Sequence, residues 1–208
     1  MNDSPLERIG SAAAGIAHDI NNQLNLIVNH LSLPGVDGEG VNYARQAAQR
    51  CSALTASLLS YCKRPGNDIQ SLDLSRQLRS FASQLRLPSG VKVEFDVPNS
   101  LPLIRGSKMG IDRALRNLVG NACDAMECHG TLRITASPQQ IDVSDSGPGI
   151  CTEVIKRIFE PFYSTKGEEG YGMGLAIVRE LMREQGGHVS VVSEPGHGAT
   201  FTLRFRPA

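Results

Sequence analysis

Aromatic residues and an excess of one charge are both scarce in this sequence. It has no tryptophan, and Tyr and Phe number only four and six among 208 residues. With 40% hydrophobic residues, such a chain builds its core mainly from Leu, Ile, Val and Ala. Lys plus Arg equals Asp plus Glu at 21 each, so the formal net charge is zero. Without a general positive field to attract phosphate backbones, we expect no nucleic-acid partner.

Long apolar runs, a signal sequence and paired cysteines are also lacking. No run approaches the ~18 residues of a membrane span. The N-terminus has no charged region followed by an apolar one, so we expect no membrane segment and a cytoplasmic location. The five cysteines form an odd set without a C-x-x-C spacing, which argues against a zinc site and against a disulfide framework. We therefore expect buried, reduced thiols.

The sequence opens instead with a long helical block. Ser4-Pro5-Leu6-Glu7 is a capping box with proline at the first helical position, which predicts a helix from Pro5 to about Leu33. Apolar residues follow in steps of three or four, and a second such run predicts a helix over 41–64. One hairpin cannot bury both apolar seams alone. We therefore predict a homodimer in which two hairpins form an antiparallel four-helix bundle.

From Asn67 onward the pattern changes to mixed elements. Helices are predicted over about 74–87, 107–128, 152–158 and 175–185, and strands over 91–97, 131–136, 140–145, 188–193 and 200–206. These elements indicate an α+β fold, a two-layer sandwich. The predicted domains are therefore 1–66 and 67–208, and Pro65-Gly66-Asn67 is the expected hinge between them.

The segment Asp145-Ser-Gly147-Pro-Gly149 places a carboxylate at the end of a predicted strand. Glycines there allow the backbone to approach a flat ligand closely, and the carboxylate can accept a hydrogen bond from an amino group such as that of adenine. The alternative is a tight turn with no ligand.

A second glycine cluster ends in Gly172-Met-Gly174, directly before the predicted helix 175–185. Free N–H groups and the helix dipole favour a phosphate at such a helix start. Lys166, just upstream, adds a positive charge for a β- or γ-phosphate. The alternative is a mobile surface loop, which is common for glycine-rich runs.

Two asparagines, Asn117 and Asn121, are four residues apart on the predicted helix 107–128, so both amides project from one face. Asparagine is a poor helix former in the interior of a helix, so two of them on one face suggest a specific role. The carbonyl oxygen of an amide, Asn121 above all, can ligate Mg²⁺ beside nucleotide phosphates. The alternative is that both make local packing hydrogen bonds.

These three elements, in this order, resemble the N, G1 and G2 boxes of the Bergerat (GHKL) ATP-binding fold. Residues 158–162 (Ile-Phe-Glu-Pro-Phe) resemble its F box, and the resemblance covers about 70–206. It implies ATP and Mg²⁺ as cofactors. Hydrolytic members carry a Glu general base where this chain has Asn117, and an amide cannot accept a proton in that role. The acceptor of the phosphoryl group is then expected elsewhere.

The first helical block contains Gly15-Ile-Ala-His18-Asp19-Ile-Asn-Asn22, which resembles the H box of two-component sensor histidine kinases. A lone histidine on a helix is usually an ordinary surface residue. The resemblance, together with the nucleophilicity of a neutral imidazole, favours His18 as the phosphoacceptor. Asp19 would orient its ring, and Asn22, one turn along, would position a water for dephosphorylation of a partner.

Taken together, the two blocks resemble a histidine kinase core. The resemblance implies autophosphorylation of His18, followed by transfer to an Asp on the receiver domain of a response regulator. One departure is Ala199, where Thr or Ser often follows the last glycine of the G3 box; Thr200 would alternate to the other strand face. Two alternatives remain: a histidine phosphotransfer or scaffold protein that no longer turns over ATP, and a GHKL serine/threonine kinase of the anti-sigma type.

Overall fold

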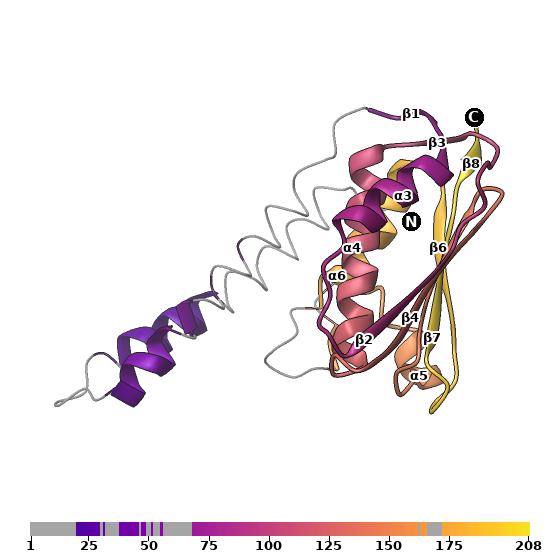
Figure 1. Ribbon diagram of the computed structural model, residues 1–208. Helices are drawn as coiled ribbons and strands as arrows, with labels where there is room; N and C mark the ends of the chain where they lie inside the picture. The colour runs from indigo at the N-terminus through magenta and orange to yellow at the C-terminus, as the bar shows by residue number, and fades with distance from the viewer. Residues whose placement is uncertain are drawn as a thin grey trace. The chain divides into compact units, whose positions relative to one another are not determined.

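The computed structural model describes residues 20–29, 31, 38–45, 47–48, 51, 55, 68–161, 163–165 and 172–208 (Figure 1). The chain divides into two compact units, Met1–Arg64 and Pro65–Ala208. Within the described residues, no helix combines the length and the hydrophobicity needed to cross a membrane.

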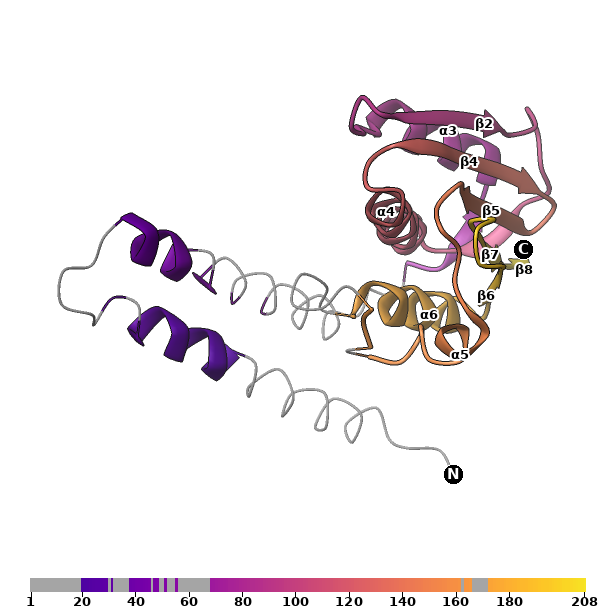
Figure 2. The same ribbon diagram turned by 90° about the horizontal axis from the view of Figure 1, so that it is seen from below.

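The first unit is helical wherever it is described. Residues 20–29 and 38–45 form two helical stretches that run side by side (Figure 2). The Cys51 thiol lies 3.7 Å from the carbonyl oxygen of Ile20, which links the two helices of the hairpin. The predicted helix start at Pro5 and helix end at Leu33 lie outside the described residues.

The second unit is built on a five-stranded mixed sheet of order β2-β4-β5-β7-β6. Its strands are β2 (Val91–Asp96), β4 (Gly130–Ser137), β5 (Gln140–Asp145), β6 (His188–Ser193) and β7 (Ala199–Arg204). Only β2 and β4 pair in parallel, and the remaining neighbours are antiparallel. Three helices, α3 (Leu74–Gln84), α4 (Lys108–Ala125) and α6 (Gly174–Glu184), cover one face of this sheet (Figure 1).

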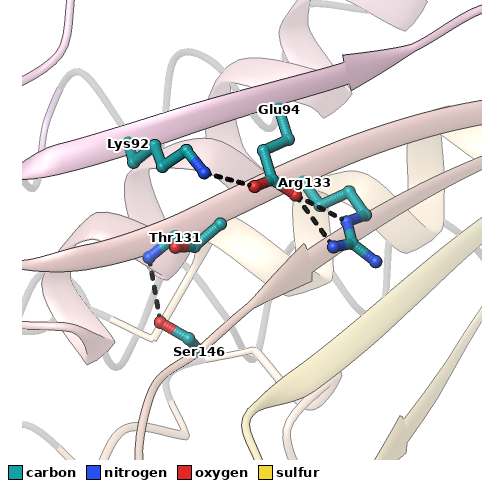
Figure 3. Close-up of polar contacts among 5 residues, drawn as sticks. All are labelled: Lys92, Glu94, Thr131, Arg133 and Ser146. Carbon is teal, nitrogen blue, oxygen red and sulfur yellow. Dashed lines mark hydrogen bonds and ion pairs between the residues drawn. The ribbon is translucent and has the colours of Figure 1, made fainter.

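The core lies between that face and the helices, because apolar residues alternate along the strands and recur at helical spacing. The largest side chains with under 2% exposure are Leu74, Leu78, Ile104, Ile111, Leu115, Leu118, Leu132, Ile134, Ile141, Met182 and Leu203. The opposite face is polar: Glu94 pairs with Lys92 at 2.8 Å and with Arg133 at 2.8 Å (Figure 3). The predicted two-layer sandwich is therefore found in this unit.

Local signals explain where helices α3 and α4 begin. The hydroxyl of Ser107 accepts a hydrogen bond from the Gly110 N–H at the start of α4, and Asp73 accepts from the N–H groups of Ser75 and Arg76 at the start of α3. Helix α4 ends where Glu127 and Cys128 adopt positive φ angles of 49° and 60°. These two residues return the chain toward β4.

A second, three-stranded sheet was not predicted. It consists of β1 (Gln70–Leu72), β3 (Ile104–Gly106) and β8 (Arg206–Pro207), in the order β1-β3-β8. Strands of two or three residues are too short to show an alternating pattern, so only long-range pairing reveals them. The predicted strand 200–206 is accordingly split into β7 and β8.

Three further expectations need correction. The first helix of the unit ends at Gln84 rather than near 87, because Leu85 already adopts an extended conformation. Helix α5 (Thr152–Ile155) is one turn long instead of reaching 158. Of the described cysteines, all free, only Cys123 is buried, and Cys151 is exposed.

Candidate functional site

The carboxylate of Asp145 is oriented by the backbone on both sides of it. Its Oδ1 accepts hydrogen bonds from the Gly147 N–H at 2.9 Å and from the Ala199 N–H at 3.3 Å. Among the described residues, no hydrogen bond ends on Oδ2, which leaves that oxygen for a ligand. Burial raises the pKa of Asp145, and the two N–H donors oppose that rise. The site thus holds a half-buried carboxylate in a fixed orientation.

The loop after Asp145 interlocks with the turn between β6 and β7. Gly149 has φ +73°, and a Cβ there would lie 2.0 Å from the carbonyl oxygen of Glu194. A Cβ on Gly198, also at φ +73°, would lie 1.9 Å from the carbonyl oxygen of Asp145. Both positions therefore require glycine. A hydrogen bond of 2.8 Å from the Ile150 N–H to the Ser193 hydroxyl also joins the loop to the end of β6.

Ser146 was not singled out from the sequence, yet it fastens the same loop to β4. Its hydroxyl accepts a hydrogen bond from the Thr131 N–H at 2.9 Å (Figure 3), and its own N–H donates to the Thr131 carbonyl at 3.1 Å. A serine hydroxyl within a glycine-rich turn is a common local motif. Its partner lies fifteen positions earlier in the chain, so spacing alone gave no signal for this contact.

Helix α4 connects this loop to the start of α6. Asn117, Asn121 and Ala125 are spaced by four, so they follow one line along the helix. A Cβ on Gly174 would lie 3.4 Å from Asn117 Oδ1 and 3.5 Å from Asn121 Oδ1. At the other end of the line, a Cβ on Gly147 would lie 3.4 Å from the Ala125 carbonyl oxygen. The structure therefore brings the three predicted elements together along α4.

The asparagines fit a magnesium ion that is held mainly by phosphates. Asn117 Nδ2 donates a hydrogen bond of 2.9 Å to the Arg113 carbonyl, which directs its Oδ1 toward Gly174. In the described part of the chain, no three His, Cys, Asp or Glu side chains form a cluster that could hold a metal. The possible metal ligands here are the neutral amide oxygens of Asn117 and Asn121, which suit Mg²⁺ when phosphate and water supply its other ligands.

The position of Ala199 follows the predicted strand alternation. Ala199 is buried and pairs directly with Asp145 in the β5–β7 register. The Thr200 hydroxyl lies on the opposite face, 2.9 Å from the Ser144 hydroxyl. No side-chain hydroxyl at residue 199 or 200 therefore reaches the Asp145 carboxylate.

Other candidate residues are only partly described. Gly172 has a positive φ of 59° just before α6, and Asn22 is exposed on the helical stretch 20–29. His18, Asp19 and Lys166 lie outside the described residues. Within the F-box-like segment, Ile158 is buried and the Phe159 ring packs edge-on against Phe201, with 6.4 Å between ring centroids. This packing anchors the segment between the two glycine elements to β7.

Comparisons with known proteins agree with this geometry. Residues 106–208 match the family described as "Histidine kinase-, DNA gyrase B-, and HSP90-like ATPase". Over 95% of its length, the chain is 32% identical to the sensor histidine kinase ZraS of Escherichia coli strain K12, and it spans only 45% of that relative.

Two solved structures are similar over nearly the whole chain. Full-length ShkA in complex with AMPPNP has a TM-score of 0.64 at 25% identity, over 99% of this chain and 47% of ShkA. The histidine kinase ThkA in complex with the response regulator protein TrrA has a TM-score of 0.73 at 24% identity, over 98% of this chain and 63% of the other. At that identity, the second likeness is one of fold.

Proposed function

Residues 106–208 belong to the histidine kinase-, DNA gyrase B- and HSP90-like ATPase family in a chain homologous to sensor histidine kinases, and on that premise we propose that the protein is an ATP-dependent histidine kinase. The proposed reaction is phosphorylation of His18, followed by transfer to an aspartate of a response regulator. The proposed domains are a dimerisation and phosphoacceptor domain over 1–66 and an ATP-binding domain over 67–208.

One observation carries the nucleotide half of this proposal. Helix α4 joins the Asp145–Gly149 loop and the Gly174 helix start, with two amides between them. We assign adenine to the Asp145 carboxylate and Gly147–Gly149, and the phosphates to the start of α6 from Gly172 to Gly174, with Lys166 as an added charge. The ShkA relative binds AMPPNP, which supports an adenine nucleotide as the ligand.

The amides define what the site does with the nucleotide. Asn121, with Asn117 beside it, would hold Mg²⁺, which neutralises phosphate charge when it is bound. Neither amide can take a proton from water, so the site has no base for hydrolysis at Asn117. A nitrogen of the neutral His18 imidazole would attack the γ-phosphorus in line as the bond to the ADP oxygen breaks, giving phosphohistidine and ADP.

After that step, an aspartate carboxylate of the response regulator attacks the same phosphorus and His18 leaves as imidazole. We assign Asp19 to orienting the imidazole and Asn22 to positioning water in a separate, opposing reaction, in which water attacks the aspartyl phosphate of the regulator and releases inorganic phosphate. The complex of the relative ThkA with a response regulator protein supports a receiver domain as the partner.

The described part of the first unit supports a homodimer. Leu24, Val28 and Leu31 are 47%, 59% and 52% exposed, although they are spaced by four and three on one helical face. A contiguous apolar stripe of this kind marks an interaction surface. A second hairpin placed against it would complete a four-helix bundle.

The deciding experiment is incubation with γ-labelled ATP and Mg²⁺. We expect a protein-bound label that acid removes and base does not, because phosphohistidine is acid-labile. His18→Gln should abolish labelling and leave ADP binding unchanged, whereas the control His30→Gln in the same predicted helix should label normally. An acid-stable label, or labelling that survives His18→Gln, would contradict the proposal. Failure to bind nucleotide would favour a phosphotransfer or scaffold protein instead.

A further inference from the structure

Gln185 is a buried polar residue at the end of α6 that the proposed chemistry does not use. It is 5% exposed, yet both ends of its amide are hydrogen-bonded. Its Oε1 accepts from the Ser107 N–H at 2.7 Å, and its Nε2 donates to the Leu181 carbonyl at 2.9 Å. The amide therefore joins the last turn of α6 to the residue that caps α4.

The start of α4 leaves little space around this amide. A Cβ on Gly106 would lie 3.1 Å from Gln185 Oε1, and a Cβ on Gly110 would lie 3.0 Å from Gln185 Nε2. Ser107 itself is 3% exposed, so its N–H has no access to water as an alternative partner. Both the direction and the distance of the contact are thus fixed.

The same two helices form the phosphate end of the site about three turns away. Gln185 follows Gly174 by 11 positions and Asn117 follows Ser107 by 10, which at 1.5 Å per residue is about 16 Å and about 15 Å. Gln185 meets Ser107 at one end, and Gly174 meets Asn117 at the other. Helices α4 and α6 are therefore antiparallel and matched in length between the two contacts.

From this geometry we infer that Gln185 is a positioning residue for the nucleotide site, because it sets the register of α6 along α4. Apolar contacts between the helices are non-directional, whereas the hydrogen bond from the Ser107 N–H to Gln185 Oε1 has a fixed length and direction, and the bond from Nε2 to the Leu181 carbonyl holds the amide in that orientation. A slip of one residue would move Gly174 by about 1.5 Å relative to Asn117 and Asn121. This inference rests on the proposed nucleotide-binding function.

The test compares Gln185→Met with Gln77→Met in the full chain. Gln77 is also 5% exposed and also hydrogen-bonded, to Asp112 of α4 at 2.6 Å, but it lies on α3. Both variants lose a buried amide, and only the first releases α6. We expect the dissociation constant for ADP with Mg²⁺, measured by calorimetry well below the unfolding midpoints, to rise at least tenfold for Gln185→Met. It should stay within twofold of wild type for Gln77→Met.

A ligand-free readout accompanies the affinities. The Gly174 amide resonance should shift in the ¹⁵N spectrum of Gln185→Met and stay in place in Gln77→Met. Equal ADP affinities and an unmoved Gly174 resonance would overturn the inference while leaving the proposed function intact. A wild-type chain that does not bind ADP would instead overturn the proposed function, and this inference with it.

A second pair of variants decides the matter if Gln185→Met does not fold. Gly110→Ala places a methyl group against the Gln185 amide, whereas Gly120→Ala, on the same helix, meets nothing within 4 Å. We expect ADP affinity to fall at least fivefold for Gly110→Ala and to stay unchanged for Gly120→Ala. Equal affinities for these two variants would refute the positioning role.

Discussion

The backbone N–H of Ala199 donates a hydrogen bond of 3.3 Å to the carboxylate of Asp145, so the first residue of β7 orients the last residue of β5. Gly147 supplies a second N–H to the same oxygen. Because both donors belong to the backbone, the orientation does not depend on the side chain at 199. The alanine found there thus leaves intact the geometry that directs Asp145 toward a ligand.

Asp145→Asn should weaken ADP binding by about 10- to 100-fold, because a hydrogen bond to a charged group contributes about 1.5–3 kcal/mol. The control is Asp142→Asn on the same strand, since Asp142 accepts hydrogen bonds from Gln140 and Thr202 on the polar face of the sheet. Isothermal titration with ADP and Mg²⁺ measures both variants. Equal losses of ADP affinity in the two variants would show that Asp145 does not contact the nucleotide.

The stability of the protein should fall as the pH rises through the titration of Asp145. Burial raises the pKa of this carboxyl in the folded state, so between its unfolded value of about 3.9 and its folded value the native chain binds more protons. The contribution of the protonated Asp145 carboxyl to stability is fully present below its unfolded pKa and is lost as the pH rises through its folded pKa. Asp145→Asn should remove this slope and be more stable than wild type at neutral pH. Urea unfolding at several pH values tests this, and parallel curves for the two proteins would disprove it.

Gly149→Ala should destabilise the second unit by more than about 2 kcal/mol, because its methyl group would meet the Glu194 carbonyl at 2.0 Å. Gly196→Ala is the matched control: its φ is +83°, but a Cβ there meets nothing within 4 Å. It should therefore cost only the backbone strain, about 1 kcal/mol. Chemical denaturation gives both values, and equal costs would mean that the close approach is unimportant.

Leu24→Asp should convert the chain from dimer to monomer, because it places a charge in the exposed apolar stripe with Val28 and Leu31. Asn25→Asp adds the same charge at the neighbouring exposed position, off the stripe, and should leave the dimer unchanged. Sedimentation equilibrium of both variants provides the measurement. A wild-type chain with monomeric mass would refute the proposed bundle.

Much of the second unit could be predicted because its signals are local. Ser107 begins α4 as the capping pattern indicated, and strands 140–145 and 188–193 have the predicted bounds. The glycines, the asparagine pair and Asp145 were found by motif, since each motif is contiguous. Their convergence along α4 was implied only by the family resemblance.

What could not be predicted depends on contacts between distant segments. The parallel pairing of β2 with β4 and the small sheet β1-β3-β8 arise from long-range partners. Ser146 and Gln185 were missed because their partners, Thr131 and Ser107, are remote in sequence. Neither a serine in a turn nor a glutamine at a helix end carries a signal of its own.

The interlock of Gly149 with Glu194, and of Gly198 with Asp145, has a practical consequence for reporters of this protein. A hairpin turn between an edge strand and its neighbour is ordinarily a safe place to insert a peptide tag or a fluorophore. Here the turn 194–198 packs directly against the loop that follows Asp145. An insertion there would disturb the segment it was meant to observe.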